Sequence, residues 1–177
     1  MEKAQIGLAG EYYVLAQLAQ RGLVGALTLG HTKGIDILVS DSRYKTLFRV
    51  EVKTTIKKPL HEKLFGKTAF YTWTMSQKHE TIKDDRLYYC FVNMGNSDEL
   101  PKFFIVPSKK VAAYVRNQHN RWLKSRKSKV QDTTMRRFRI AVDDPDGYFM
   151  NWKVFGKASN HPAGADRAAH RARYPSN

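Results

Sequence analysis

Cysteine is almost absent from this chain of 177 residues, in which Cys90 is the only one. A single cysteine excludes an internal disulfide and any zinc site built from several thiolates. Cys90 stands inside the apolar run 87–92, where we expect a buried thiol that acts as a small hydrophobic side chain. The scarcity of cysteine also favours a reducing, cytoplasmic setting.

Long apolar segments are lacking as well. Runs such as Tyr88–Val92 have the length of a strand, far below the roughly 20 residues that a membrane-spanning helix needs. The N-terminal residues enter an amphipathic pattern directly, so we expect no signal peptide. The chain has no glycine-rich phosphate loop, and its six histidines show no metal-ligand spacing. We expect His31 to be a loop residue first and a substrate contact second.

Acidic residues are few beside basic ones. The sequence has 31 Lys and Arg against 16 Asp and Glu, a net charge of +15. Such a surplus predicts attraction to polyanions, nucleic acid first and anionic membrane second. Apolar residues make up 42% and aromatic residues 12%, which is typical of a globular chain and not of a disordered one.

The spacing of the apolar residues predicts an α/β or α+β domain with a mixed sheet. We expect one domain over residues 1–156, with a core at about 5–107 and a basic part at about 108–156, and then a weakly structured basic tail at 157–177. One helix is expected at about 4–21, closed by Gly22, and another at about 109–124, capped by Ser108. The expected strands cover 24–29, 35–40, 46–54, 70–74, 87–93, 103–106 and 138–142, with an irregular connection at 59–67.

The strand at 46–54 carries the sharpest chemical signal. Alternation places its apolar residues on one face and Arg49, Glu51 and Lys53 on the other. A turn at 41–43 predicts a hairpin with the preceding strand, which would bring Asp36 beside Glu51. Two adjacent carboxylates repel each other unless a proton or a cation intervenes. A divalent metal, Mg²⁺ or Mn²⁺, is one solution.

The first helix adds a third carboxylate. At 100° per residue, Glu11 falls within an apolar stripe. The stripe consists of Ala4, Leu8, Glu11, Leu15 and Leu18. A carboxylate that faces a core is costly unless it is paired or binds a metal. A helix packed on the sheet would direct Glu11 toward Asp36 and Glu51.

Simpler interpretations stay open for these residues. A Glu-x-Lys pattern with an upstream Asp often arises by chance, so Glu51 and Lys53 could form a solvated strand face. Glu11 could be a residue of the helix surface. Arg49 could be a partner of the carboxylates, a phosphate contact or simply solvent-exposed.

Three segments together resemble the PD-(D/E)XK nuclease superfamily, in particular its small members such as archaeal Holliday-junction resolvases and Mrr-like restriction domains. They are GEYY at 10–13, GIDIL at 34–38 and VEVKT at 50–54. The resemblance covers about residues 5–55, and Ile35 replaces the proline that usually precedes the aspartate. It implies a restriction-endonuclease-like fold, in which helices flank a mixed central β-sheet.

The resemblance also implies a catalytic set. Asp36, Glu51 and the backbone carbonyl of Val52 would hold Mg²⁺ or Mn²⁺, and Glu11 would contribute directly or through water. Lys53 would orient the attacking water, help to deprotonate it and offset charge in the transition state. The activity implied is a metal-dependent endonuclease that hydrolyses phosphodiester bonds of DNA, junction-resolving or restriction-like. We expect a homodimer, because cutting a duplex or a junction usually needs two sites.

The segment 102–139 is strongly basic, with twelve Lys or Arg against one Asp, a net charge of +11. We expect it to contact phosphates, with a solvated basic helix as the alternative. The expected DNA-binding residues are Arg49, Lys57, Lys58, Arg116, Arg121, Lys124, Arg126, Lys127, Lys129, Arg136 and Arg137. Phe70, Tyr71 and Trp73 could stack on bases, but core packing is the favoured interpretation.

Three functions therefore compete. The leading hypothesis is the Mg²⁺-dependent endonuclease, with DNA and a second copy of the chain as partners and without a membrane or a small-molecule cofactor. The second is a catalytically inactive nucleic-acid-binding module on the same fold. The third is a basic structural protein on nucleic acid or anionic lipid.

Overall fold

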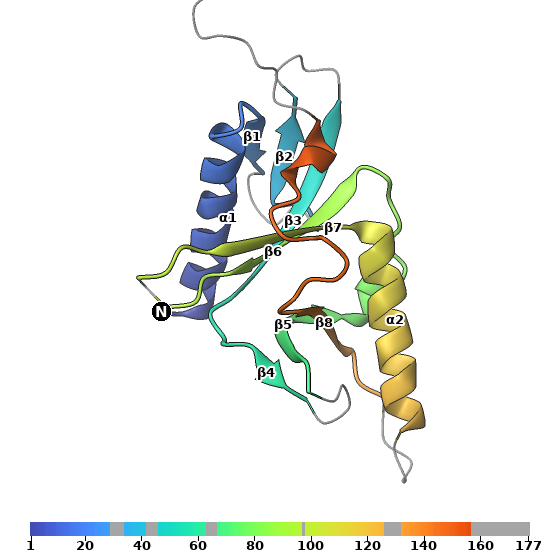
Figure 1. Ribbon diagram of the computed structural model, residues 1–177. Helices are drawn as coiled ribbons and strands as arrows, with labels where there is room; N and C mark the ends of the chain where they lie inside the picture. The colour runs from blue at the N-terminus through green and yellow to red at the C-terminus, as the bar shows by residue number, and fades with distance from the viewer. Residues whose placement is uncertain (29–33, 42–45, 63–66, 97, 126–131, 157–177) are drawn as a thin grey trace, which may run out of the picture.

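Two β-sheets and two helices make up the computed structural model, which describes residues 1–28, 34–41, 46–62, 67–96, 98–125 and 132–156 (Figure 1). The helices are α1 (Lys3–Ala19) and α2 (Ser108–Lys124), with short 3₁₀ helices η2 (Gln77–Glu80) and η3 (Trp152–Phe155). The strands are β1 (Val24–Leu27), β2 (Ile37–Ser40), β3 (Leu47–Thr55), β4 (Leu60–His61), β5 (Ala69–Ser76), β6 (Leu87–Asn93), β7 (Lys102–Pro107) and β8 (Met135–Ala141).

The large sheet has the strand order β1-β2-β3-β6-β7. Its β3–β6 pair is parallel and its other pairs are antiparallel, so the prediction of an α/β fold with a mixed sheet flanked by helices is confirmed. A second, antiparallel sheet has the order β4-β5-β8. The separation into two sheets was not predicted, and β4 lies where an irregular connection was expected.

Both faces of the large sheet are covered. On one face, Val14 and Leu18 of α1 pack against strand residues that include Ile37 and Val50. Cys90 joins this core and is fully buried, as expected. Figure 1 shows α1 along one side of the large sheet and α2 on the opposite side of the molecule.

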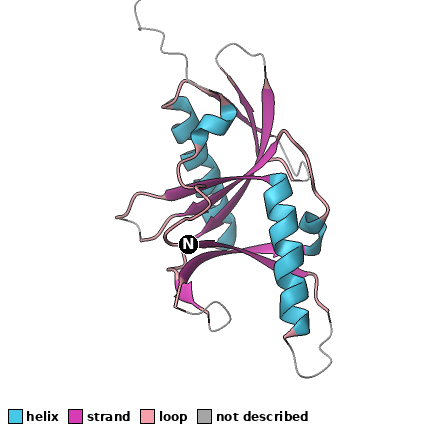
Figure 2. Cartoon of the chain, turned by 45° about the vertical axis from the view of Figure 1, so that its right-hand side comes forward, coloured by secondary structure: helices cyan, strands magenta, loops and turns pink. Residues whose placement is uncertain are grey.

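The other face of the large sheet packs against the small sheet and α2. Trp73 of β5, Phe91 of β6 and Phe138 of β8 meet there, with Phe91 and Phe138 stacked at 4.4 Å between ring centroids. Figure 2 shows the small sheet below the large one, with α2 beside both. Tyr71 and Trp73 are buried, so the core interpretation of these aromatic residues is confirmed.

The ends of the two helices differ in how well the sequence predicted them. Gly22 follows α1 with a φ of +66°, the left-handed conformation expected of a glycine that closes a helix. The prediction that Ser108 caps α2 is wrong, because Pro107 occupies the N-cap. The buried Ser108 hydroxyl instead donates to the Asp84 carbonyl at 2.7 Å and accepts the Asp84 N–H at 2.9 Å. No helix in the described part of the chain is long and apolar enough to span a membrane.

Candidate active site

The predicted hairpin of β2 and β3 brings Asp36 to the edge of β3. Ile37 pairs with Val50, and the Asp36 N–H donates to the Val50 carbonyl at 2.9 Å. The Val52 N–H then donates to Asp36 Oδ2 at 2.6 Å. The N–H and C=O of one strand residue point to the same side, so the Val52 carbonyl is also directed toward Asp36. A carboxylate and a backbone carbonyl therefore lie on the same edge of β3, where β2 begins.

Glu51 lies on the opposite face of β3 from Val50 and Val52, as the alternation predicted. It is not solvated, since only 2% of its surface is exposed. Lys53 Nζ lies 2.6 Å and His79 Nε2 lies 3.3 Å from the same carboxylate oxygen, Oε1. Burial by itself would raise the pKa of Glu51, but the hydrogen bond from His79 and the charge and hydrogen bond of Lys53 outweigh it and lower the pKa to about 2. The side chain is therefore ionised at neutral pH.

The second oxygen of Glu51 has a different environment. Oε2 is buried and makes no hydrogen bond of normal geometry with the described residues. The buried Tyr89 hydroxyl, which also makes none, lies near the carboxylate, and burial and the charge of Glu51 raise the pKa of Tyr89. A Cβ added at Gly34 would lie 3.4 Å from it, and Gly34 has a φ of +76°. An ionised oxygen without a partner is unfavourable in a protein interior. Glu51 Oε2 is therefore suited to coordinate a cation.

Two further carboxylates take part in the same electrostatic cluster. Burial raises the pKa of Asp36, and the charge of Glu51 adds to this rise while the Val52 N–H and the charge of Lys53 oppose it. Burial also raises the pKa of Glu11, with a further contribution from the charge of Asp36. The four residues predicted from the sequence therefore lie within electrostatic reach of one another. Of these four, Asp36 and Glu11 have raised pKa values, chiefly because they are buried and in part because each lies near another carboxylate.

Close packing of α1 on β3 sets the position of Glu11. A Cβ at Gly10 would lie 1.9 Å from Thr54 Oγ1, so only glycine allows this approach. The predicted apolar stripe is wrong in its details, because the buried residues of α1 are Gly10, Val14 and Leu18, whereas Leu8 is 49% exposed. Glu11 flanks the buried stripe and is half-buried.

His79, which was not predicted from the sequence, also belongs to this site. His79 on η2 is 3% exposed, and its ring meets that of Tyr89 edge-on at 5.8 Å. Its Nδ1 lies 3.0 Å from the Ser76 N–H donor and 3.1 Å from the Ser76 hydroxyl. The available signal was the pattern Ser76-x-x-His79 directly after a predicted strand, which is the spacing of a capping box.

The oxygen atoms present suit a small divalent cation. In the described residues, no three His, Cys, Asp or Glu side chains are grouped so that they could hold a metal by themselves. Mg²⁺, however, is commonly held by one or two carboxylates and several waters. Asp36, the unpartnered Oε2 of Glu51 and the Val52 carbonyl provide two carboxylates and a carbonyl. This donor set fits Mg²⁺ or Mn²⁺.

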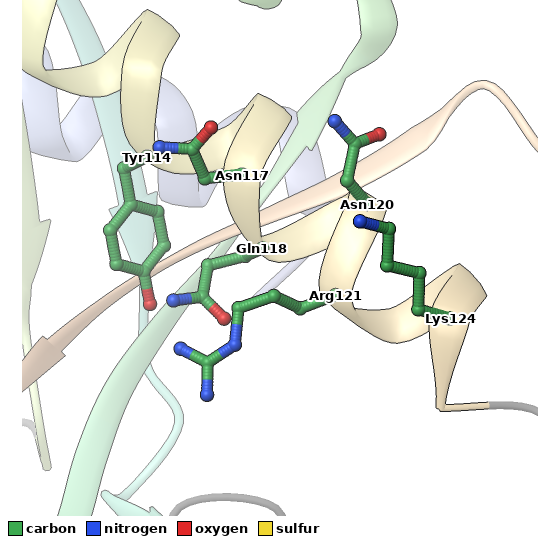
Figure 3. A pocket seen from close by; sticks show the side chains of 6 residues that line it. All are labelled: Tyr114, Asn117, Gln118, Asn120, Arg121 and Lys124. Carbon is green, nitrogen blue, oxygen red and sulfur yellow. The ribbon is translucent and has the colours of Figure 1, made fainter.

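The basic residues of α2 form a second feature. Arg116, Arg121 and Lys124 are exposed, and the helix has no acidic residue. A shallow pocket lies along its C-terminal half, lined by polar and basic side chains and the ring of Tyr114. The lining residues are Tyr114, Asn117, Gln118, Asn120, Arg121 and Lys124 (Figure 3). In Figure 3 the side chains of Tyr114, Gln118 and Arg121 point to one side of the helix, and the amine of Lys124 lies beside Asn120.

Two of the predicted DNA contacts have partners within the protein. The side chain of Arg136 is 2% exposed and forms an ion pair with Glu80, so its placement on a DNA-binding surface is corrected: it is a buried structural cation. Arg49 forms an ion pair with Asp84, and 39% of its side chain is exposed. It is therefore not a partner of the site carboxylates, and it is not simply solvent-exposed.

The remaining predicted contacts divide into two groups. Lys57, Lys58 and Arg137 are exposed, as a phosphate contact requires. Arg126, Lys127, Lys129, His31 and the tail at 157–177 lie outside the described residues.

Comparison with known proteins locates the fold. No protein-family model matches the sequence, and no curated protein matches it significantly. Among solved structures, a bacterial homing endonuclease, I-Ssp6803I, is similar with a TM-score of 0.51 and 15% sequence identity, over 98% of this chain and 99% of that chain. At this level of identity, the likeness shows that the two chains share a fold.

Proposed function

We propose that this chain is a metal-dependent endonuclease that hydrolyses phosphodiester bonds of DNA, with its catalytic centre at Asp36, Glu51 and Lys53. The observation that carries the proposal is the Glu51 side chain, which is ionised and buried and has one oxygen without a partner beside Asp36. Lys53 and His79 stabilise the charge at Oε1, but an ionised Oε2 without a hydrogen bond is unfavourable in a protein interior. Binding a divalent cation is the function that best accounts for it.

The chemistry follows from the donor set. Asp36, Glu51 Oε2 and the Val52 carbonyl would hold Mg²⁺ or Mn²⁺, which, when bound, neutralises phosphate charge and lowers the pKa of water. Lys53 is the cation of the site, and 28% of its side chain is exposed. From there its Nζ can contact an attacking water or a phosphoryl oxygen and offset developing negative charge. Glu11, half-buried with a raised pKa, is placed to accept a proton from water near Asp36.

DNA is the proposed substrate for two reasons. The net charge of +15 is concentrated in part on α2, where exposed cations and amides occur without an acidic residue. The solved structure with a similar fold is that of a homing endonuclease. Junction-resolving and restriction-like cleavage both use this chemistry, and the relative affinity for a four-way junction and a linear duplex separates them.

A homodimer is part of the same proposal, since cutting both strands of a duplex requires two sites. The exposed face of α1 is a suitable contact surface. Leu8, Tyr12 and Tyr13 are 49%, 56% and 45% exposed there. Light scattering tests this part by measuring the molar mass in solution. We expect a dimer for the wild-type protein and a monomer for Tyr12→Arg, and a monomeric wild-type protein would contradict the proposal.

A nicking assay tests the activity. Supercoiled plasmid is incubated with the protein and Mg²⁺ or EDTA, and the same variants are compared for binding to a four-way junction, a linear duplex and a single strand. Glu51→Gln and Asp36→Asn should each reduce cleavage by a factor of about 100 or more without loss of DNA binding, whereas Glu99→Gln on an exposed loop should cut normally. Binding without Mg²⁺-dependent cleavage by the wild-type protein would instead favour the inactive binding module.

A further inference from the structure

His79 is a buried titratable residue that the chemistry above does not use. It lies outside the three motif segments, on η2, and reaches β3 from the end of β5. Only 3% of its side chain is exposed, and the ring of Tyr89 packs against it. In the described part of the chain, it contacts the site carboxylates through Nε2, which lies 3.3 Å from Glu51 Oε1.

The direction of this hydrogen bond follows from the chemistry of the two groups. An ionised carboxylate can only accept, so Nε2 must carry a proton and donate to Oε1. On the opposite side of the ring, Nδ1 accepts the Ser76 N–H at 3.0 Å and lies 3.1 Å from the Ser76 hydroxyl. Contacts on both ring nitrogens leave the imidazole no freedom to turn away from Glu51.

The two donors on Oε1 make the oxygens of Glu51 inequivalent. A carboxylate rotates easily about its last bond, and without anchors either oxygen could face Asp36. Because Lys53 and His79 both engage Oε1, Oε2 is the oxygen left for a cation. Lys53 cannot serve as the only anchor, since its half-exposed amine is the group proposed to act on water or phosphate.

We propose that His79 is a positioning residue that holds Glu51 Oε1 and thereby presents Oε2 to the divalent cation. This inference rests on the proposed metal-dependent function. Residues that orient a metal ligand through a hydrogen bond typically contribute about 10- to 100-fold to metal affinity. Loss of the His79 hydrogen bond should therefore weaken metal binding even though His79 does not touch the metal.

Asparagine and glutamine separate this role from a purely structural one. The Gln amide nitrogen occupies a position close to that of His Nε2 and can still donate to Glu51. The Asn amide ends near the position of His Nδ1, so it keeps the contact with Ser76 and loses the one with Glu51. His79→Gln and His79→Asn therefore form a matched pair, and His61→Gln on the exposed strand β4 is the remote control.

The test is Mn²⁺ binding to the full-length protein, measured by electron paramagnetic resonance, with thermal unfolding of each variant in EDTA. We expect His79→Asn to raise the Mn²⁺ dissociation constant by about 10- to 100-fold, with His79→Gln and His61→Gln close to wild type. If His79→Asn is folded and binds Mn²⁺ like the wild type, or if the two His79 variants bind equally well, His79 is not a positioning residue. A change in melting temperature alone would likewise overturn the inference.

Mn²⁺ binding by the wild-type protein distinguishes a failure of this inference from a failure of the proposed metal-dependent function. If wild-type Mn²⁺ binding is absent, or is unchanged in Glu51→Gln, the metal site itself is wrong and both proposals fall. If wild-type binding depends on Glu51 but not on His79, only the role of His79 is lost.

Discussion

Val52 donates its backbone N–H to Asp36 Oδ2 at 2.6 Å, and this bond joins the start of β2 to the middle of β3. Val52 stands between Glu51 and Lys53 in the chain, but its side chain points to the opposite face. The site therefore draws on two parts of one strand: the face that carries Glu51 and Lys53, and the edge that carries the Val52 amide and carbonyl. Asp36 is the residue that connects them.

Asp36→Asn should stabilise the metal-free protein at neutral pH. The folded-state pKa of Asp36 is raised above its ordinary value of 3.8, chiefly by burial, so the ionised carboxylate destabilises the fold above that pKa. The Asn carbonyl can still accept the Val52 N–H. The melting temperature in EDTA at pH 7 should exceed that of the wild type, and the difference should shrink as the pH falls toward and below 3.8. Asp143→Asn, at an exposed position, is the control; a destabilised Asp36→Asn protein would contradict the expectation.

Glu51→Gln should destabilise the metal-free protein at neutral pH, the opposite of the effect expected for Asp36→Asn. The pKa of Glu51 is lowered from 4.5 to about 2, so its charge stabilises the fold fully above pH 4.5, and this contribution disappears as the pH falls through about 2. The variant should melt below the wild type at pH 7 in EDTA, and the two curves should approach each other near pH 2. Calorimetry over this range is the measurement, and a difference that grows on acidification would exclude the assignment.

Gly34→Ala should impair metal binding. Its φ of +76° imposes strain on any other residue, about 1–2 kcal/mol, and the new Cβ would lie 3.4 Å from Glu51 Oε2. Gly22→Ala is a matched control, because Gly22 has a φ of +66° and nothing within 4 Å. Both variants should lose similar stability in urea titrations. Only Gly34→Ala should bind Mn²⁺ more weakly in calorimetry, and equal affinities in the two variants would show that the space above Oε2 is not used.

Gly10→Ala should disturb the packing of α1 on β3. The added Cβ would lie 1.9 Å from Thr54 Oγ1 and 2.9 Å from Thr54 Cβ, so rotation of Thr54 cannot relieve the clash. We expect a loss of about 1–3 kcal/mol in the free energy of unfolding and slower cleavage, because Glu11 moves with the helix. Gly7→Ala, with nothing within 4 Å, should instead stabilise α1 by about 0.5–1 kcal/mol. Thr54→Gly should partly rescue Gly10→Ala; without rescue, the contact is not the cause.

Arg121→Ala/Lys124→Ala should weaken binding to duplex DNA at all sequences. Each lost phosphate contact should reduce the slope of log K against log salt by about 1, because fewer counterions are released. The double variant Lys3→Ala/Lys153→Ala removes the same charge at exposed positions away from α2 and serves as the control. Fluorescence anisotropy between 50 and about 200 mM salt measures both slopes. Identical slopes in the two double variants would remove α2 from the DNA-binding surface.

The strands of the large sheet were predictable because their signals are local. Alternation in β3 separates Glu51 and Lys53 from Val50 and Val52 whatever the rest of the chain does. A turn at 41–43 predicts the hairpin that pairs β2 with β3. The stripe on α1 was predicted less well, because helical periodicity leaves a choice of faces, and the contact of Gly10 with Thr54 decides between them.

The charged residues show the limit of local signals. Arg136 belongs to a basic run and was expected on the surface, but the alternation of β8 turns it to the buried face, where Glu80 neutralises it. Arg49 lies on the face of Glu51, yet Asp84 from a distant loop takes its guanidinium. Sequence distance hid both partners, since each pair joins segments at least 35 residues apart.

Strand alternation and the predicted turn were enough to place Asp36, Glu51 and Lys53 on one side of a hairpin, and composition was enough to show the large positive charge. The burial of this side could not be predicted, because it depends on how the two sheets pack. The small sheet and η2 cover the Glu51 face of β3, which excludes water from the carboxylate and brings in His79 from 28 residues away. The physical reason is that burial and hydrogen-bond partners arise from contacts between elements, whereas alternation along a strand is a property of the backbone alone.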